Sequence, residues 1–513
     1  RLTRAFGTKE ARTTSYTYTP SGRLATKTTP NVKTLTYSYS PLGFLTERHS
    51  SDRAISHSFA YNKLGSLTSA IDAVQNIAID REVDPFGNVL RERFPSGLEV
   101  KKEYDAMDRP LSLTLGQEGT VFYSYDPLYL RKVERYSPTG QLLYTHERSA
   151  YDLSGHLTCE ELIGNLGQVI HTKDRCGRNE GLVSPYLSQH CHYDGCGNLV
   201  ACDEEEKHNY TYDGLSQLTS EVSKSNAQVY QYDSLHNRLS KNEKTYQHNS
   251  LNELAQGKYD LNGNQLISRE WELVYDPLNQ LIEAKKGCKC FHFAYDPLGR
   301  RLSATLQEGG AQAKEEYLYD GQEEIGSFTP YMQAQNLKVL GKSTKESFPS
   351  TIAIEVDGKP FAPVIDVQGN VRHLLDLKTK KVVNRYAYSA FGEPLETYEK
   401  VFNPWRYAAR RIDPELGLLY FGKRYYDPAF SRWLTIDPAG FVDSMNLYQY
   451  CLNNPFAYLD LNGEFLFLIP LVPLLMGGSI TALVVQTAVA SAVAAGVVWG
   501  GQKLHNYYNK YNR

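Results

Sequence analysis

Two acidic turn elements near the end of the sequence contain aspartates that could act as a pair. Asp437 opens an Asp-Pro-Ala-Gly element, and Asp460 opens an Asp-Leu-Asn-Gly element 23 residues later. If the two carboxylates meet, one keeps a proton, so the pair offers a base that activates water and an acid that protonates a leaving group. Both aspartates also suit ordinary turns, in which Asp opens the turn and Gly closes it at positive φ. From the residues alone, both interpretations stay open.

A second group of potential ligand residues lies near the middle of the chain. It comprises His190, Cys191, His192, Cys196 and Cys202. The spacing allows a metal site, but no second pair of cysteines follows at matching distance, so free buried thiols are favoured. Cys288 and Cys290 alternate onto one strand face, which suits neither a disulfide between them nor a metal knuckle. We therefore expect no metal site and no cofactor.

The segment 465–513 differs in composition from the rest of the chain. It contains no Asp or Glu and only one His, His505, so it lacks the groups that nucleases, deaminases and ribosyl transferases need. The uncharged run 480–499 is long enough to cross a bilayer as a helix, and the basic Lys503 follows it. A membrane-inserting helix is the favoured interpretation. A stored hydrophobic segment and a remnant of a longer domain are the alternatives.

These residues have to be positioned by a repeat that fills most of the sequence. A Tyr, usually followed by Asp, two further residues, Gly and then Arg or Asn, recurs mostly every 19 to 22 residues. Clear copies have their glycines at Gly155, Gly197, Gly263 and Gly299. Asp and Gly form a turn, and the flanking residues alternate as in strands, so each unit is a β-hairpin. We expect stacked hairpins in one long antiparallel sheet, with these glycines at positive φ.

The 38 tyrosines of the chain allow two interpretations. The favoured one is structural, because aromatic pairs across neighbouring strands stabilise a sheet. The alternative is an exposed aromatic face on which sugars stack. A repeated aromatic in every hairpin suits cohesion of the sheet better.

Composition excludes several classes of protein. The apolar fraction of 41% can build a core, and a net charge of −3 does not favour nucleic-acid binding. Eight cysteines in 513 residues are too few for a disulfide scaffold. The chain begins with Arg1, so we expect a fragment or a processed product whose export signal lies elsewhere.

The repeats, and a stronger motif after them, resemble those of bacterial Rhs proteins, the C component of insecticidal toxin complexes and the shell of teneurins. The motif comprises Arg406-Tyr407-Ala-Ala-Arg410-Arg411-Ile-Asp413-Pro-Glu-Leu-Gly417, Arg424-Tyr425-Tyr426-Asp427-Pro428, Arg432-Trp433, Asp437-Pro438-Ala-Gly440 and Asn446-Leu447-Tyr448-Gln449-Tyr450. The resemblance covers about residues 15–464. It implies a hollow shell of spiralling β-hairpins, closed by a core domain, with a variable C-terminal segment held inside or threaded from it.

The same resemblance gives the acidic pair a role. In the similar toxins, two matching aspartates and an upstream arginine cut the chain just after the second acidic element. By this likeness Asp437 and Asp460 are the catalytic pair, Arg424 is the helper, and the bond cut is Glu464–Phe465.

The sequence departs from the family pattern at this point. Leu461 replaces a proline that would fix one φ angle, and Glu464 replaces a leucine and adds a third carboxylate beside the pair. The resemblance therefore implies self-cleavage, and the departures leave its activity open.

Together these observations predict a mainly β protein in three parts. They are a YD-repeat β-shell over residues 1–330, incomplete at its N-terminus, an Rhs repeat-associated core over 331–464, and a variable hydrophobic α-helical segment over 465–513. Short helical turns are expected near 408–411 and 443–453. The only enzyme activity expected is an aspartic autoprotease acting on the chain itself, since no enzymatic toxin domain is recognisable.

The expected function is an Rhs-type shell that sequesters a membrane-active C-terminal effector and releases it by self-cleavage. The alternatives are a surface-anchored adhesion or carbohydrate-binding protein whose tail is a membrane anchor, and a structural remnant without activity. Expected partners are the tail itself as cargo, secretion machinery or an immunity protein, and a membrane through 480–499. Carbohydrate remains a further candidate, and nucleic acid is not expected. Such a protein would be secreted by a bacterium or displayed on its surface.

Overall fold

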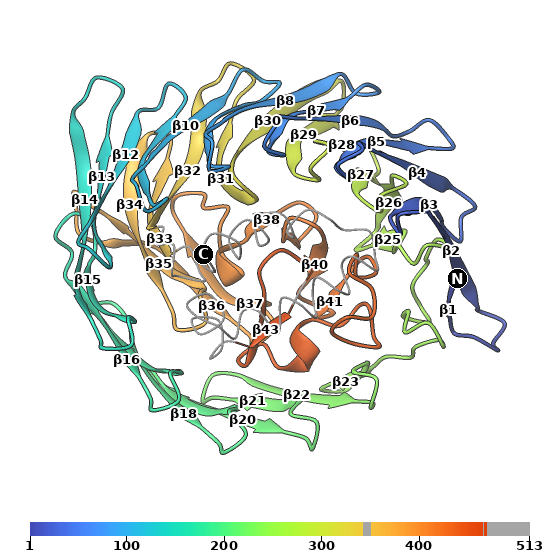
Figure 1. Ribbon diagram of the computed structural model, residues 1–513. Coiled ribbons are helices and arrows are strands. Elements are labelled where there is room, and N and C mark those ends of the chain that lie inside the picture. Colours follow the sequence, from blue (N-terminus) through green and yellow to red (C-terminus); the bar gives the residue numbers. More distant parts are fainter. Residues whose placement is uncertain (342–349, 465, 469–513) are drawn as a thin grey trace.

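The computed structural model describes residues 1–341, 350–464 and 466–468, and these residues are almost entirely strands and turns. Consecutive strands pair antiparallel within four sheets of 24, 13, four and two strands in this part of the chain. Figure 1 shows the two large sheets winding as a spiral around a central segment. The mainly β, antiparallel fold predicted from the repeats is confirmed.

The first sheet forms the outer turn of the spiral (Figure 1). Its strands are β1 (Leu2–Arg4), β2 (Arg12–Tyr18), β3 (Leu24–Thr28), β4 (Thr34–Tyr39), β5 (Leu45–Ser50), β6 (Ser56–Tyr61), β7 (Leu67–Asp72), β8 (Ile77–Val83), β9 (Val89–Arg93), β10 (Glu99–Tyr104), β11 (Pro110–Leu115), β12 (Thr120–Tyr125), β13 (Leu130–Tyr136), β14 (Leu142–Tyr151), β15 (Leu157–Glu161), β16 (Gln168–Lys173), β17 (Asn179–Val183), β18 (Ser188–Tyr193), β19 (Leu199–Asp203), β20 (Lys207–Tyr212), β21 (Leu218–Val222), β22 (Ala227–Tyr232), β23 (Arg238–Lys241) and β24 (Lys244–Thr245).

The second sheet follows the first as an inner turn. Its strands are β25 (Ile267–Ser268), β26 (Trp271–Tyr275), β27 (Leu281–Lys286), β28 (Lys289–Tyr295), β29 (Arg301–Glu308), β30 (Ala311–Asp320), β31 (Glu323–Phe328), β32 (Ala334–Gly341), β33 (Ser350–Val356), β34 (Lys359–Ile365), β35 (Val371–Asp376), β36 (Val382–Tyr388) and β37 (Pro394–Glu399). The centre holds η1 (Tyr407–Ala409), β38 (Arg411–Asp413), β39 (Leu418–Tyr420), β40 (Tyr425–Asp427), β41 (Arg432–Trp433), η2 (Cys451–Asn453), β42 (Tyr458–Asp460) and β43 (Leu466–Leu468). The two short 3-10 turns, η1 and η2, lie where helical turns were expected.

Many of the repeats are held by a Tyr and by the Asp that follows it. In the copy at Tyr295, the Asp296 Oδ1 atom accepts the backbone N–H groups of Leu298 and Arg300, which fixes the turn. The Tyr295 hydroxyl donates to the carbonyl of Leu281 in the preceding unit. The same hydroxyl-to-carbonyl bond recurs at Tyr39, Tyr151, Tyr193, Tyr212 and Tyr319. The tyrosines therefore link neighbouring hairpins, in agreement with the structural role predicted for them.

The residue four places after the Asp extends this link forward. Arg109 donates to Asp105 of its own turn and to the carbonyl of Asp126 in the next, and it stacks on the ring of Tyr125. Arg178, in the turn between β16 and β17, makes the equivalent contacts. Because units joined in this way support one another, the hairpins form one continuous sheet although a single hairpin would be marginal alone.

The two turns of the spiral are joined by polar contacts between residues far apart in the sequence. Arg4 donates to the carbonyl of Asn262 at the start of the seam, and Lys241 pairs with Glu393 near its end. Along the seam between these two contacts, the long stretch 4–241 of the outer turn is thus matched by the shorter stretch 262–393 of the inner turn. The inner turn covers the same arc with far fewer strands, so the spiral narrows toward its centre (Figure 1).

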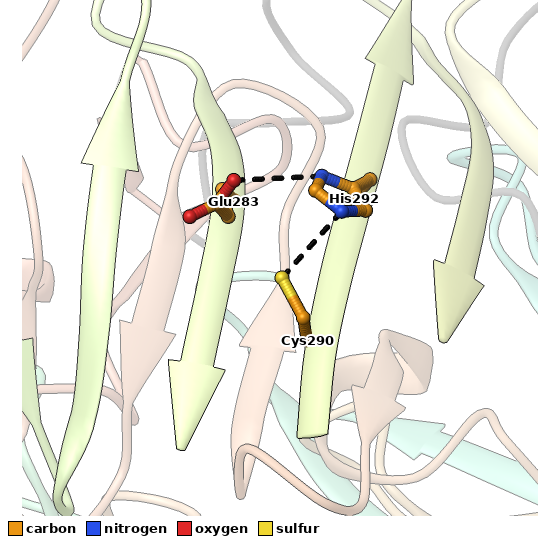
Figure 2. A group of neighbouring side chains, drawn as sticks. All are labelled: Glu283, Cys290 and His292. Atoms are coloured by element: carbon orange, nitrogen blue, oxygen red, sulfur yellow. Dashed lines mark hydrogen bonds and ion pairs between the residues drawn. The ribbon is translucent and has the colours of Figure 1, made fainter. Parts of the chain in front are cut away.

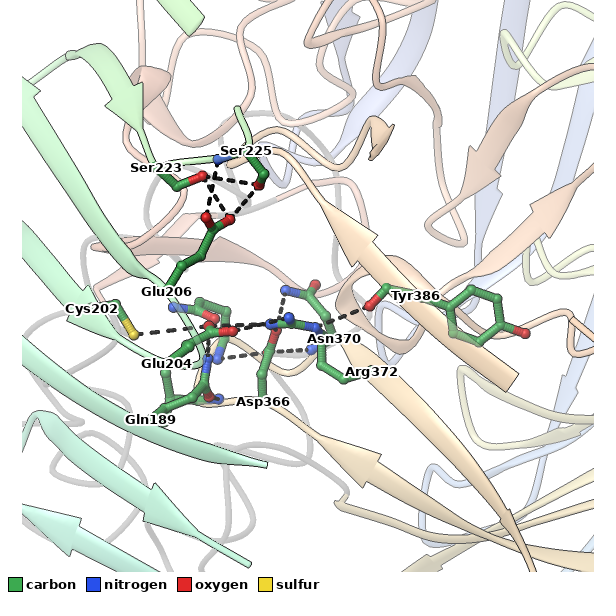
Figure 3. A network of polar contacts seen from close by, with 12 residues as sticks. Gln189, Cys202, Glu204, Glu206, Ser223, Ser225, Asp366, Asn370, Arg372 and Tyr386 are labelled. Carbon is green, nitrogen blue, oxygen red and sulfur yellow. Dashed lines mark hydrogen bonds and ion pairs between the residues drawn. The ribbon is translucent and has the colours of Figure 1, made fainter. Parts of the chain in front are cut away.

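Figure 3 shows one of these seam contacts. Both Arg372 Nη atoms on β35 donate to the Glu204 carboxylate after β19, at 3.2 and 3.0 Å. Gln189 holds Glu204 from the outer turn, and Asp366 lies 3.6 Å from Arg372 on the inner one. A cavity of about 810 Å³ opens beside this network, between β19–β22 and β35–β37. Elsewhere the two turns share an apolar core, in which Leu113 and Val121 of the outer turn join Leu337 and Val364 of the inner turn. The turns therefore meet through apolar packing as well as polar contacts, with hollow space beside this network.

The centre of the spiral is aromatic. Phe421, Tyr426, Trp433 and Tyr450 pack against one another with ring centroids 4.4–5.9 Å apart. They join Leu218 and other buried residues of the outer turn in one core cluster. This packing fixes the central segment relative to the shell.

The prediction for the C-terminal segment falls largely outside what the structure describes. Of the segment 465–513, predicted to be helical, only residues 466–468 are described, and they form β43, paired with β42. Among the described residues, none lies in a helix long and apolar enough to cross a membrane. The boundary predicted at residue 330, between the YD-repeat shell and the Rhs repeat-associated core, stays a prediction. In the structure β31 and β32 pair across this position, within one continuous sheet.

Candidate active site

The three residues predicted from the acidic motif meet at the centre of the spiral. Arg424 lies in the turn between β39 and β40, Asp437 follows β41, and Asp460 ends β42. The Asp437 N–H donates to the carbonyl of Leu447, and the Lys423 N–H donates to the carbonyl of Asn462. These backbone bonds bring three segments that are separated in sequence to one point.

One guanidinium bridges the two carboxylates. The Arg424 Nη2 atom lies 2.6 Å from Asp437 Oδ2 and 3.1 Å from Asp460 Oδ2. Its Nε donates to the carbonyl of Gly463 at 2.6 Å, and the guanidinium carbon lies 4.2 Å from the ring centroid of Trp433. Since all of these contacts fix one side chain, Arg424 holds both acidic elements together.

The second acidic element is wrapped tightly around its aspartate. Asp460 Oδ1 accepts the N–H groups of Asn462, Gly463 and Glu464 at 3.2, 2.6 and 3.0 Å. Gly463 has φ of +71°, and a Cβ there would lie 3.1 Å from the backbone nitrogen of Arg424. The loop is thus shaped by hydrogen bonds to the aspartate and by this glycine, with Leu461 in place of the proline.

Burial changes the acidity of the pair. It raises the pKa of Asp437 to about 7, against the opposing effect of Arg424, and the neighbouring Asp460 raises it further. Burial also raises the pKa of Asp460, while Arg424 and the three backbone donors oppose that shift. The Asp460 side chain is 1% exposed and that of Asp437 16%. A pair of this kind keeps a proton at a pH where free aspartates have lost theirs.

The extra carboxylate at Glu464 has basic neighbours. Burial raises the pKa of Glu464, and the positive charges of Lys423 and Arg424 oppose that shift. Lys423 also donates from Nζ to the carbonyl of Leu298 on the inner turn. The third carboxylate expected beside the pair is therefore accompanied by a second cation that the motif did not point to.

The site opens onto a space. Asp460 and Leu461 line a cavity of about 300 Å³ that extends to His146, Glu160 and His171 of the outer turn. Two buried carboxylates, a bridging cation and adjacent space are the components that acid–base hydrolysis of a peptide bond requires.

The other predicted cluster is separated by strand alternation. Cys191 and Cys202 lie opposite each other on β18 and β19 with their sulfurs 3.5 Å apart, both buried. His190 and His192 point to the other face, where His192 pairs with Asp203 at 3.0 Å. The five residues therefore do not converge on one metal position.

Two residues of the site were not identified from the sequence. Trp433 lies under Arg424, and Lys423 faces Glu464. Trp433 belongs to the Arg-Trp pair of the recognised motif, which was a signal for it. Lys423 offered no signal, because its position depends on how the turn before β40 folds against the inner sheet.

Comparisons with known proteins agree with the fold. The family model described as "Teneurin YD-shell" matches residues 196–456, half of the chain. The probable deoxyribonuclease RhsA of Dickeya dadantii is 23% identical over 443 residues, which cover 82% of this chain and 28% of that protein. The toxin subunit YenC2 of Yersinia entomophaga is 45% identical over 65 residues, which cover 13% of this chain and 7% of that protein.

A solved structure shows the same fold. The crystal structure of TcdB2-TccC3 without its hypervariable C-terminal region has a TM-score of 0.73 at 17% identity, covering 88% of this chain and 27% of that one. The chain spans less than a third of the length of each of these proteins. The spiral of hairpins, the closing aromatic core and the family match confirm the resemblance seen in the sequence: the chain belongs to the teneurin YD-shell family, together with Rhs-type proteins.

Proposed function

We propose that this chain is the closing part of an Rhs-type encapsulating shell that cuts itself at Glu464–Phe465, so that residues 465–513 are no longer covalently joined to the shell that holds them. The observation that carries the proposal is that Arg424 bridges Asp437 and Asp460. Asp460 lies four residues before Glu464, whose bond to Phe465 is to be cut. The cut would separate the structured core from a segment of different composition.

In the proposed reaction, a water molecule adds to the carbonyl carbon of Glu464. Asp460 takes the proton from this water, because three amides and Arg424 favour its ionised form. Asp437, with a pKa near 7, gives its proton to the Phe465 nitrogen as the C–N bond breaks. The products are a carboxylate at residue 464 and a new amino terminus at residue 465.

The proposed cargo is the released segment itself. It lacks the carboxylates of a toxin enzyme, and its run 480–499 has the length and apolarity of a membrane-crossing helix. Relatives of this chain are named as nucleases and toxin subunits, and we propose that this chain exposes a membrane-active segment in place of an enzyme. Such a protein would act outside the bacterium that makes it, as part of a toxin assembly.

The experiment that tests this proposal follows cleavage in the full chain during refolding from denaturant. Asp437→Asn and Asp460→Asn each keep the size of the side chain but remove an ionisable group, so both should stop the cut. Asp427→Asn is the matched control, because Asp427 is also buried and paired with an arginine, Arg269 at 2.6 Å, but does not touch Arg424. The control should still cleave.

Gel electrophoresis with N-terminal sequencing of the small product gives the result. A new terminus at Phe465 that disappears in both site variants supports the proposal. Cleavage that persists in both variants, or that stops equally in the Asp427 control, would overturn the aspartic mechanism.

A further inference from the structure

A cluster of three different ligand side chains lies on the inner turn, on adjacent strands. Glu283 is on β27, and Cys290 and His292 are on β28 (Figure 2). Glu283 and His292 are direct partners in the antiparallel register, and Cys290 is two residues before His292 on the same face. The pairing of the two strands therefore brings the three side chains together.

The opposite face of β28 carries the packing. Phe291 and Phe293 alternate with the cluster residues and pack into the core with Trp271 and Tyr425. The cluster face is correspondingly open: the His292 side chain is 43% exposed and that of Glu283 36%. An ion from solution can reach these ligands without disturbing the core.

The three side chains are near enough to share one ion. One ligand atom from each of the three residues can be chosen so that all lie within 4.8 Å of one another. His292 Nδ1 lies 3.6 Å from Glu283 Oε2, and its other ring nitrogen, Nε2, lies 3.5 Å from Cys290 Sγ. Because an imidazole binds an ion through one nitrogen, and tetrahedral zinc with bonds of about 2.0–2.3 Å needs its ligand atoms roughly 3.3–3.8 Å apart, the side chains have to rotate when the ion binds.

We propose that Glu283, Cys290 and His292 form a site for a divalent zinc ion, with water in the fourth position. A thiolate, an imidazole and a carboxylate are the ligand types that zinc accepts together. Among the described residues, this is the one group of three His, Cys, Asp or Glu side chains that meets the distance condition. An ion bound here would tie β27 to β28 on the open face of the sheet.

The assignment separates two neighbouring cysteines that look alike in sequence. Cys288 also precedes His292 in the sequence, but it lies in the turn before β28, is exposed and is not part of the cluster. Cys290 is the proposed ligand and Cys288 is not. This pair therefore supplies a matched control.

The experiment is a titration of the metal-free full chain with Co²⁺, followed by competition with Zn²⁺. We expect a thiolate-to-cobalt charge-transfer band that saturates at one ion per chain and is displaced by zinc. Cys290→Ser should abolish the band, and His292→Ala or Glu283→Gln should weaken affinity at least about tenfold. Cys288→Ser should leave the band and the affinity unchanged.

Three results would overturn the site. They are no charge-transfer band in the wild-type chain, a band that survives Cys290→Ser, and a band that is lost with Cys288→Ser. The three cluster side chains lie on the open face and Cys288 lies in an exposed turn, so the variants should fold, which far-ultraviolet circular dichroism verifies. Self-cleavage is scored separately and does not depend on this site.

Discussion

In many repeats an aspartate stabilises the turn, and its surroundings decide how much it contributes. Asp296 pairs with Arg300 at 2.7 Å, and both side chains are fully buried. Arg300 also binds Glu92 of the outer turn, at 3.0 Å. Asp126 occupies the equivalent place in a repeat of the outer turn, but its partner Arg131 is 37% exposed. Asp296 therefore takes part in the contact between the two turns of the spiral, whereas Asp126 stabilises a turn that is open to solvent.

We predict that Asp296→Ala destabilises the chain by about 3–5 kcal/mol, because it leaves Arg300 buried without one of its two carboxylate partners. Asp126→Ala, the matched control, should cost no more than about 2 kcal/mol, mainly for the lost turn contacts. Urea unfolding of the two variants measures the difference. Equal losses would mean that the seam contact adds nothing to the turn contact.

The acidity of Asp437 predicts a pH dependence of self-cleavage. The pKa of Asp437 is raised to about 7, so the carboxyl group holds the proton it must donate below pH 7 and loses it above. The rate of cleavage should therefore fall, by up to about tenfold per pH unit, as the pH rises above 7. Refolding the chain at a series of pH values and quantifying the cut product tests this. A rate that rises through pH 7 to 9 would assign the opposite role to Asp437.

For individual residues, the sequence was informative where they belong to a recognisable motif. That Arg424, Asp437 and Asp460 meet was predicted from the family resemblance. No local rule joins them, because Arg424 and Asp460 are 36 residues apart in the sequence. The cluster of Glu283, Cys290 and His292 could not be predicted, since Glu283 reaches His292 only through the register of β27 and β28. Cross-strand contacts of this kind depend on a pairing that spacing alone does not give.

The turns are the elements that fix the geometry of the shell. Gly155, Gly197, Gly263 and Gly299 have φ of +87°, +90°, +95° and +79°, which confirms the prediction from the repeat. Their surroundings differ. A Cβ at Gly263 would lie 2.5 Å from the Tyr448 hydroxyl of the core, whereas at Gly197 the nearest atom would be 3.6 Å away, on Arg178.

We therefore predict that Gly263→Ala is more damaging than Gly197→Ala. Both variants carry the backbone strain of a non-glycine residue at positive φ, about 1 kcal/mol. Gly263→Ala must in addition displace Tyr448, whose hydroxyl donates to the Gly263 carbonyl. Thermal unfolding should show the larger decrease for Gly263→Ala. Similar decreases would show that the core yields easily at this contact.

The strands of the shell were predictable from the residues themselves, whereas their winding into a spiral followed only from the family resemblance. Alternating residues and turn glycines define each hairpin locally, so both follow from the sequence. The narrowing of the spiral depends on contacts such as that of Arg135 with Glu355, 220 residues apart. Nothing in one repeat indicates which distant repeat will lie beside it.

We propose that the molecule as a whole combines a structured shell with a membrane-active segment. We predict that a peptide of residues 465–513 binds liposomes and becomes helical there, because a backbone in hydrocarbon must satisfy its own hydrogen bonds. The Asp437→Asn chain, with the segment still attached, should not bind. Sedimentation with liposomes and circular dichroism measure both. A peptide that stays in solution beside liposomes would contradict the membrane role.

The most direct test of the central claim is the intact mass of the purified chain under denaturing conditions and again under native conditions. The account predicts two polypeptides in denaturant, divided between Glu464 and Phe465, and one particle near the full 58.1 kDa in native buffer, because the shell still holds the cut segment. A single polypeptide of the full mass in denaturant, after refolding below pH 7, would contradict self-cleavage.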